Sequence, residues 1–98
     1  MKISGLYISR RVQEKLDAKH GGISIDEIQQ CFANRDGAFL RDTRAEHMTD
    51  PVSQWFIAET DRGRELKIVF MNKNGDLHIK TAYEPNEDER TIYEKVSK

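Results

Sequence analysis

Residues 54–83 contain three runs of alternating apolar and polar side chains, separated by two turns that contain glycine. Strict alternation places apolar side chains on one face of a strand, so we predict strands over 54–60, 65–72 and 76–83. The turns DRG and NKNG each supply a glycine where the backbone needs a positive φ. The pattern therefore predicts three consecutive antiparallel strands.

The first twenty residues have a different pattern. The opening run KISGLYIS at 2–9 alternates in a way that suits a short strand. Ser9 is a suitable N-cap for a helix over 10–20, and Gly21 and Gly22 are suitable for ending it. We therefore predict a strand followed by a helix.

Two further helices have clear start signals. Ser24 and Glu27 have the spacing of a capping box, which predicts a helix that continues through about Phe32. Pro85 ends the last strand, and Asn86 is the expected N-cap of a C-terminal helix with acidic residues in its first turn.

The predicted fold class is α+β, with the element order β-α-α-β-β-β-β-α. A short strand over 38–43 and a polar loop over 44–53 connect the two halves. We expect one domain over 1–98, because 98 residues provide material for only one core. In this domain two N-terminal helices pack on an antiparallel sheet of about four strands, and a C-terminal helix follows.

The strand pattern also predicts which face of the sheet is free. Alternation places Lys67, His78 and Lys80 on one side, and it groups Tyr83 with Leu77 on the other. Two amphipathic helices cover only one face of such a sheet. A ligand would therefore lie on the face that carries the three basic side chains.

The chain lacks motifs for metal and nucleotide chemistry. His20, His47 and His78 have no metal-ligand spacing, and the single Cys31 excludes both an internal disulfide and a site with several cysteines. Neither a P-loop nor a dinucleotide fingerprint is present. We expect no metal and no cofactor.

Other broad classes are also disfavoured. No Gly-x-Ser-x-Gly elbow is present, and no apolar run approaches the roughly 20 residues of a membrane span. The formal net charge of −1 provides no overall field to attract nucleic acid, so an anion site would have to be local. A lone thiol fits a reducing compartment, and we expect a cytoplasmic protein.

The remaining functional groups suit a phosphodiester. RNA cleavage through the 2'-hydroxyl requires cations on the phosphorane and proton transfer, but no metal. Cations on exposed strands more often serve solubility alone. The candidate groups are Arg62, Arg64, Lys80, Tyr83 and Arg41, with Tyr93 and Lys95 on the last helix.

Two segments resemble a known toxin family. KLDAKHGGISIDEIQQCF resembles the segment K-x-x-KHGVS-x-EE-x-x-x-x-F of the BrnT-like toxins, which belong to the RelE/ParE superfamily. IKTAYE and DERTIYEK resemble that family's R-I-I-S-A-R strand and E-R-x-x-Y-E ending. The resemblance implies a RelE-like fold and a bacterial type II toxin, a ribonuclease that inhibits translation and is neutralised by an antitoxin protein.

The resemblance also assigns roles. Lys19 and His20 match the family's basic pair, Arg62 or Arg64 matches its hairpin, and Lys80 matches the strand arginine. The implied catalytic residues are Lys80, Arg64, Tyr83 and His20, with Lys80 as electrostatic stabiliser and Tyr83 or His20 in proton transfer. The implied RNA-binding residues are Arg62, Lys19, Arg41, His78 and Tyr93.

Partners and alternatives follow from the same resemblance. The expected partners are the antitoxin and RNA, either free or on the ribosome. Formation of an oligomer is compatible with either partner. Two alternatives stay open: a non-catalytic binding module of the same fold, and a small hydrolase of the ADP-ribosyl type. Strand parity groups Arg64 with Leu66 on the covered face, unless a bulge at the glycine turn shifts it by one residue. A role of this turn in the site requires Arg62 or Arg64 to converge with Lys80; if neither does, the turn is only a turn.

Overall fold

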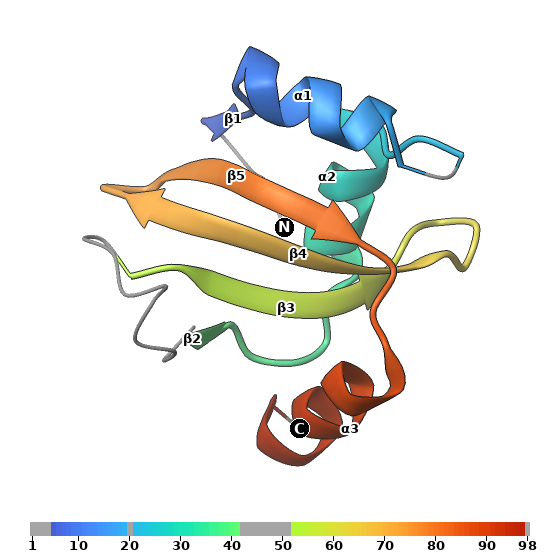
Figure 1. Ribbon diagram of the computed structural model, residues 1–98. Coiled ribbons are helices and arrows are strands. Elements are labelled where there is room, and N and C mark those ends of the chain that lie inside the picture. Colours follow the sequence, from blue (N-terminus) through green and yellow to red (C-terminus); the bar gives the residue numbers. More distant parts are fainter. Residues whose placement is uncertain (1–4, 20, 42–51, 98) are drawn as a thin grey trace.

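The computed structural model describes residues 5–19, 21–41 and 52–97, and within these residues it has three helices and one five-stranded mixed sheet (Figure 1). The helices are α1 (Arg10–Asp17), α2 (Ile25–Asn34) and α3 (Glu87–Ser97). The strands are β1 (Leu6–Tyr7), β2 (Leu40–Arg41), β3 (Gln54–Glu59), β4 (Glu65–Lys73) and β5 (Asp76–Tyr83). The elements follow the predicted α+β order.

The strand order in the sheet is β1-β5-β4-β3-β2. Strands β2 to β5 pair antiparallel with their neighbours, whereas β1 pairs parallel with β5 through the register Tyr7 to His78. The predicted α+β class is confirmed. The sheet has five strands where about four were expected, and its edge strand β1 is parallel to β5 and not antiparallel. Alternation along one strand carries no information about a partner 71 residues away.

Both hairpin turns have the predicted glycine geometry. Gly63 has a φ of +81°, and the Thr60 N–H donates to the Arg64 carbonyl across the turn at 2.8 Å. In the second turn Asn74 and Gly75 both have positive φ, as a two-residue hairpin turn requires. These turns fix the registers of β3, β4 and β5.

Helix α1 begins where predicted and ends earlier. Ser9 Oγ accepts from the Val12 N–H at 3.2 Å, so Ser9 is the N-cap. The helix ends at Asp17, three residues before the predicted limit. The Leu16 carbonyl accepts from the Ile23 N–H at 3.1 Å, and this bond turns the chain toward α2.

Helix α2 has the predicted capping box. Ser24 Oγ accepts from the Glu27 N–H at 3.1 Å, and Glu27 Oε1 accepts from the Ser24 N–H at 3.0 Å. The helix continues two residues beyond Phe32, to Asn34. Asn34 Nδ2 donates to the carbonyl of Glu59 at 2.9 Å and so ties the end of α2 to the end of β3.

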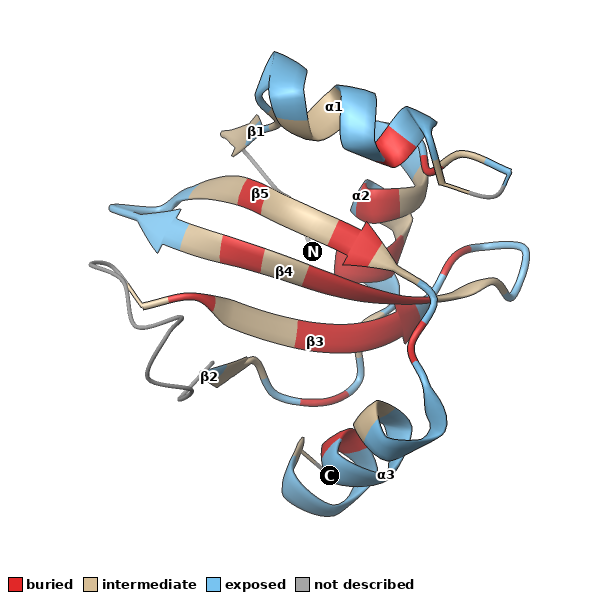
Figure 2. Cartoon of the chain, viewed as in Figure 1, coloured by how far each residue is buried: buried red, intermediate tan, exposed pale blue. Residues whose placement is uncertain are grey.

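Helices α1 and α2 cover one face of the sheet, and the core lies between them and the strands (Figures 1 and 2). Phe32 of α2 packs against Phe56 and Phe70, with ring centroids 4.7 and 5.4 Å apart. Cys31 is fully buried in the same core. Burial of these side chains supplies most of the driving force for folding.

A β-bulge at Lys80 changes the predicted faces of β5. Ile79 pairs with Phe70 and Thr81 pairs with Val69, so Lys80 is an extra residue in the ladder. The predicted grouping of Tyr83 with Leu77 is therefore wrong. Beyond the bulge Tyr83 pairs with Lys67, which places both side chains on the face opposite α1 and α2.

Helix α3 packs against β3 and covers part of the second face (Figure 1). The Tyr93 ring lies 5.6 Å from the Trp55 ring, and both side chains belong to this layer. Lys67 is only 8% exposed as a result. The predicted open face is therefore narrower than the strand pattern suggested.

Candidate functional site

The face of the sheet opposite α1 and α2 contains the candidate site, and we call it the open face. Its central residues belong to β4 and β5. The bulge at Lys80 brings Thr81 and Tyr83 of β5 to the same face as Val69 and Lys67 of β4. Most of its side chains are half-buried (Figure 2). The open face consists of Tyr7, Trp55, Lys67, Val69, Met71, His78, Lys80, Thr81 and Tyr83.

Lys80 lies near the middle of the open face. Its Nζ donates to Ser53 Oγ at 3.0 Å, and Ser53 is fully buried. An ammonium group has three donors, and among the described residues Ser53 is the only partner of Lys80. Two N–H donors are therefore available for an anion.

A cluster of charged and aromatic side chains lies beside Lys80. Lys67 Nζ lies 2.7 Å from Glu89 Oε2 and 4.4 Å from the centroid of the Trp55 ring. The Tyr83 hydroxyl donates to the same Glu89 oxygen at 2.8 Å. Glu89 also accepts from the Asn86 N–H at 3.0 Å, so one carboxylate caps α3 and binds it to the sheet.

The contacts of this cluster shift two pKa values. Burial raises the pKa of Glu89, but hydrogen bonds from Lys67, Asn86 and Tyr83 outweigh burial and the net shift is downward. Burial raises the pKa of Tyr83, and its bond to Glu89 adds to the rise. The Tyr83 proton is therefore held tightly, which disfavours the predicted role in proton transfer.

Lys19, the first residue of the predicted basic pair, lies at the margin of this cluster. Its Nζ is 5.7 Å from the centroid of the Tyr83 ring, within cation–π range. The structure therefore brings Lys19 and Tyr83 together. The second member of the pair, His20, lies outside the described residues.

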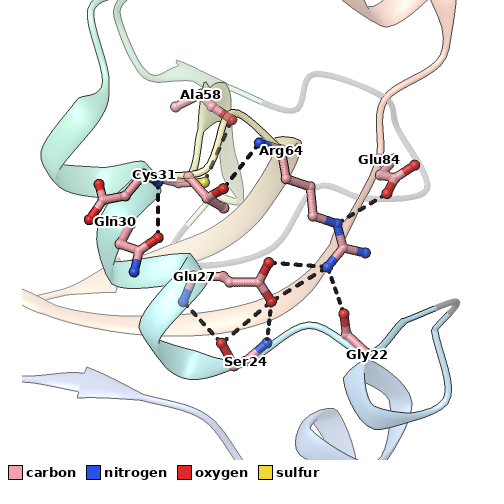
Figure 3. A network of polar contacts seen from close by, with 10 residues as sticks. Gly22, Ser24, Glu27, Gln30, Cys31, Ala58, Arg64 and Glu84 are labelled. Atoms are coloured by element: carbon pink, nitrogen blue, oxygen red, sulfur yellow. Dashed lines mark hydrogen bonds and ion pairs between the residues drawn. The ribbon is translucent and has the colours of Figure 1, made fainter.

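Arg64 lies on the other side of the sheet, in a network of polar contacts (Figure 3). Its Nε lies 3.0 Å from Glu84 Oε2, and its Nη1 lies 3.1 Å from Glu27 Oε2. The same nitrogen donates to the Gly22 carbonyl at 2.7 Å. The guanidinium thus joins the start of α2, the α1–α2 connection and the segment after β5.

The predicted convergence of Arg64 with Lys80 is not observed. Parity places Arg64 on the covered face with Leu66, as the sequence indicated, and the bulge lies in β5 and not at the glycine turn. Lys80 lies between Ile79 and Thr81, the partners of Phe70 and Val69, and is therefore at least about 17 Å along β4 from Arg64 at ~3.4 Å per residue. Arg64 is therefore a structural cation.

Two other predicted arginines also lie away from Lys80. Arg62 is exposed in the turn between β3 and β4. Arg41 pairs with Gln54, whose neighbour Phe56 belongs to the covered face, so Arg41 points to that side. The edge strand β2 had no clear alternation from which this orientation could be predicted.

Tyr93, which was predicted to bind RNA, is a buried residue of α3. Tyr93 is 3% exposed, and its hydroxyl donates to the Ala38 carbonyl at 2.8 Å. Its ring faces Trp55 and not solvent. The side chain fixes α3 to the sheet, because the inner side of an amphipathic helix is buried in the layer that it covers.

A cavity of about 580 Å³ lies at the other end of the molecule, between the end of α2, the end of β3 and α3. Five carboxylates and one arginine line it, and that arginine, Arg90, is paired with Glu65. Negative potential repels phosphate groups, so this cavity is unsuitable for RNA. The carboxylates are Asp36, Glu59, Asp61, Glu65 and Glu94.

Metal and membrane sites receive no support from the described ranges. Within 5–19, 21–41 and 52–97, no three His, Cys, Asp or Glu side chains are grouped to hold a metal ion. The helices in the described part of the chain are all too short or too polar to cross a bilayer.

Comparison with known proteins adds no further constraint. The chain matches no family model, no curated protein and no solved structure.

Several residues of the site were not predicted from the sequence. They are Tyr7, Ser53, Trp55 and Glu89, which surround the predicted Lys80 and Tyr83. The sequence did contain one signal of the bulge in β5. Leu77 and Ile79 are two positions apart, but the next small apolar residue, Ala82, follows after three, which indicates an inserted residue.

Proposed function

We propose that the chain is a toxin-like, metal-independent endoribonuclease of the RelE/BrnT type that binds RNA on the open face. The observation that carries the proposal is the position of Lys80 on the sheet face that the N-terminal helices leave free, with Ser53 as the only partner of its Nζ among the described residues. The bulge at Lys80 brings Thr81 and Tyr83 to the same face, and bulges are common next to active sites.

The proposed chemistry uses residues of β5. Lys80 stabilises the charge of the phosphorane. His78, two positions before Lys80 and about 7 Å away along the strand, is the group that we assign to proton transfer. Lys19 holds a neighbouring phosphate. Arg64 takes no part, because its guanidinium is paired on the opposite face.

The proposal includes the expected partner and location. An acidic antitoxin segment that lies on the open face would neutralise Lys80 and block RNA at the same time. The toxin would act in the cytoplasm, where it would inhibit translation. Coexpression with the product of an adjacent gene for a small DNA-binding protein is the direct test: a stable complex and relief of growth arrest are expected.

Cleavage of RNA by the purified protein tests the catalytic part. Unstructured RNA is expected to be cut in the presence of EDTA, and Lys80→Ala is expected to reduce the rate about 100-fold, as loss of a charge-stabilising donor does. Arg62→Ala removes the same charge from an exposed turn and serves as the matched control. Equal rates for both variants, or no cleavage by the wild type, would refute the nuclease.

A second candidate is the non-catalytic RNA-binding module. Two observations favour it. The Tyr83 hydroxyl donates its proton to Glu89, and Arg64 is paired on the opposite face of the sheet, so fewer groups on the open face are available for cleavage. RNA binding that weakens in Lys80→Ala, without cleavage, identifies this function. Nothing among the described residues favours a metal-dependent hydrolase.

A further inference from the structure

An exposed aromatic stack lies at the β1 edge of the open face. Tyr7 of β1 and His78 of β5 are paired in the sheet, and their rings are 5.1 Å apart with an angle of 19° between the planes. Tyr7 is nevertheless 50% exposed. The stack therefore presents aromatic surface to solvent on the same face as Lys80.

The backbone holds Tyr7 in this position. Gly5 has a φ of +75°, and its carbonyl accepts from the Leu77 N–H at 2.8 Å. The positive φ strains any residue other than glycine at this position. The register of β1 then places Tyr7 opposite His78.

The positions of the stack and of Lys80 match the two parts of a nucleotide. His78 and Lys80 lie two residues apart on β5, and Lys80 Nζ donates to Ser53 Oγ on the open face. An aromatic platform beside a cation is the arrangement with which proteins bind unpaired bases and the adjoining phosphate. Paired bases are stacked within a duplex and cannot use it.

We propose that the Tyr7–His78 stack is a nucleobase subsite, and that the RNA bound by the open face is single-stranded, with one base on Tyr7 and the adjoining phosphate at Lys80. This inference rests on the proposed function and defines its substrate class. Tyr7 contributes to affinity at one position of the RNA. It makes no contribution to proton transfer.

Fluorescence anisotropy with a short unstructured RNA tests the subsite. A set of matched RNAs, each lacking one base, measures the contribution of each base to the affinity. We expect one position at which loss of the base weakens binding at least about fivefold, as removal of one base stack does. Tyr7→Ala is expected to abolish this difference, and Tyr7→Phe is expected to preserve it, because the ring remains.

The matched variants separate a subsite from a loss of structure. If Tyr7 only supported β1, Tyr7→Ala would weaken the intact and the abasic RNA equally, and their affinity ratio would stay at the wild-type value. That result would overturn the inference. Binding of double-stranded RNA as tightly as single-stranded RNA would also overturn it.

The two proposals can fail separately. If wild-type protein binds single-stranded RNA and Lys80→Ala weakens it, while Tyr7→Ala leaves the base-dependent ratio unchanged, only the subsite is refuted. If wild-type protein binds no RNA at all, both proposals are refuted.

Discussion

Individual side chains in this protein have roles that depend on the face they occupy. Arg64 and Lys80 are both cations on adjacent strands, yet Arg64 contacts two carboxylates and a carbonyl, whereas Lys80 contacts one hydroxyl. Burial raises the pKa of Glu27, and the bonds from Ser24 and Arg64 reverse the shift. The pKa of Arg64 is raised by Glu84 and Glu27 despite the opposing effect of burial. Arg64 thus stabilises the fold.

Arg64→Ala is expected to destabilise the protein without loss of RNA affinity. The change leaves Glu27 partly buried without its cation, and charge-assisted hydrogen bonds contribute about 1.5–3 kcal/mol. Urea unfolding measures the loss. Arg62→Ala, at an exposed position of the same hairpin, is expected to stay within about 0.5 kcal/mol of the wild type. Unchanged stability together with lost RNA binding in Arg64→Ala would contradict this assignment.

The Cys31 thiol is expected to be inert in the folded protein. Burial raises its pKa to about 12, so the reactive thiolate is scarce, and the side chain is fully buried. A thiol reagent such as DTNB should react no faster than the protein unfolds, and at once in urea. Rapid reaction of the native protein would show that this part of the core opens.

At the scale of secondary-structure elements, α3 depends on one carboxylate. Glu89 caps the helix through Asn86 and accepts from Lys67 and Tyr83 on the sheet. Its side chain and that of Lys67 are 18% and 9% exposed, so solvent screens their ion pair only weakly. The contact joins a helix and a strand, each of which is predicted from its own local pattern, so the contact itself cannot be predicted from those patterns.

This contact predicts how stability depends on pH. Because the pKa of Glu89 lies below its ordinary value of 4.5 in the folded state, its contribution is present above that value and is lost as the pH falls through the lowered one. Glu89→Gln is expected to cost about 2–3 kcal/mol near pH 7 and much less near pH 3. Urea unfolding at both pH values measures this change.

The control for this experiment is Glu87→Gln, in the same first turn of α3 but with a side chain that is 90% exposed. It changes the net charge equally and is expected to leave the acid dependence intact. Glu27, whose pKa is also lowered, accounts for the acid dependence that remains in Glu89→Gln. An equal response of Glu87→Gln and Glu89→Gln would refute the specific role of Glu89.

At the scale of the whole molecule, charges of opposite sign lie at different ends. Lys80 lies on the open face and Lys19 at its margin, whereas carboxylates line the cavity between α2, β3 and α3. With a net charge of −1 the molecule has no long-range attraction for RNA. RNA would therefore be bound through a few local contacts.

Few local contacts predict a weak dependence of RNA affinity on salt. Each phosphate contact on a single strand contributes about −0.7 to the slope of log affinity against log salt concentration, so two contacts give a slope of about −1.4. Anisotropy titrations at several KCl concentrations measure it. A slope steeper than about −3 would mean that other cations, such as those of α1, lie in the interface.

The sequence by itself determined the type and order of the elements, both hairpin turns and the capping box of α2. These features depend on residues a few positions apart, so Ser24 with Glu27, or the glycines of the turns, were sufficient to predict them.

Only the tertiary structure decided which side chains meet. The parallel pairing of β1, the bulge at Lys80, the capture of Arg64 and the burial of Tyr93 all involve partners far apart in the chain. A single inserted residue in β5 moved Tyr83 to the other face of the sheet, because side chains alternate along a strand. Local patterns predict the strands, but the register of the assembled sheet determines the site.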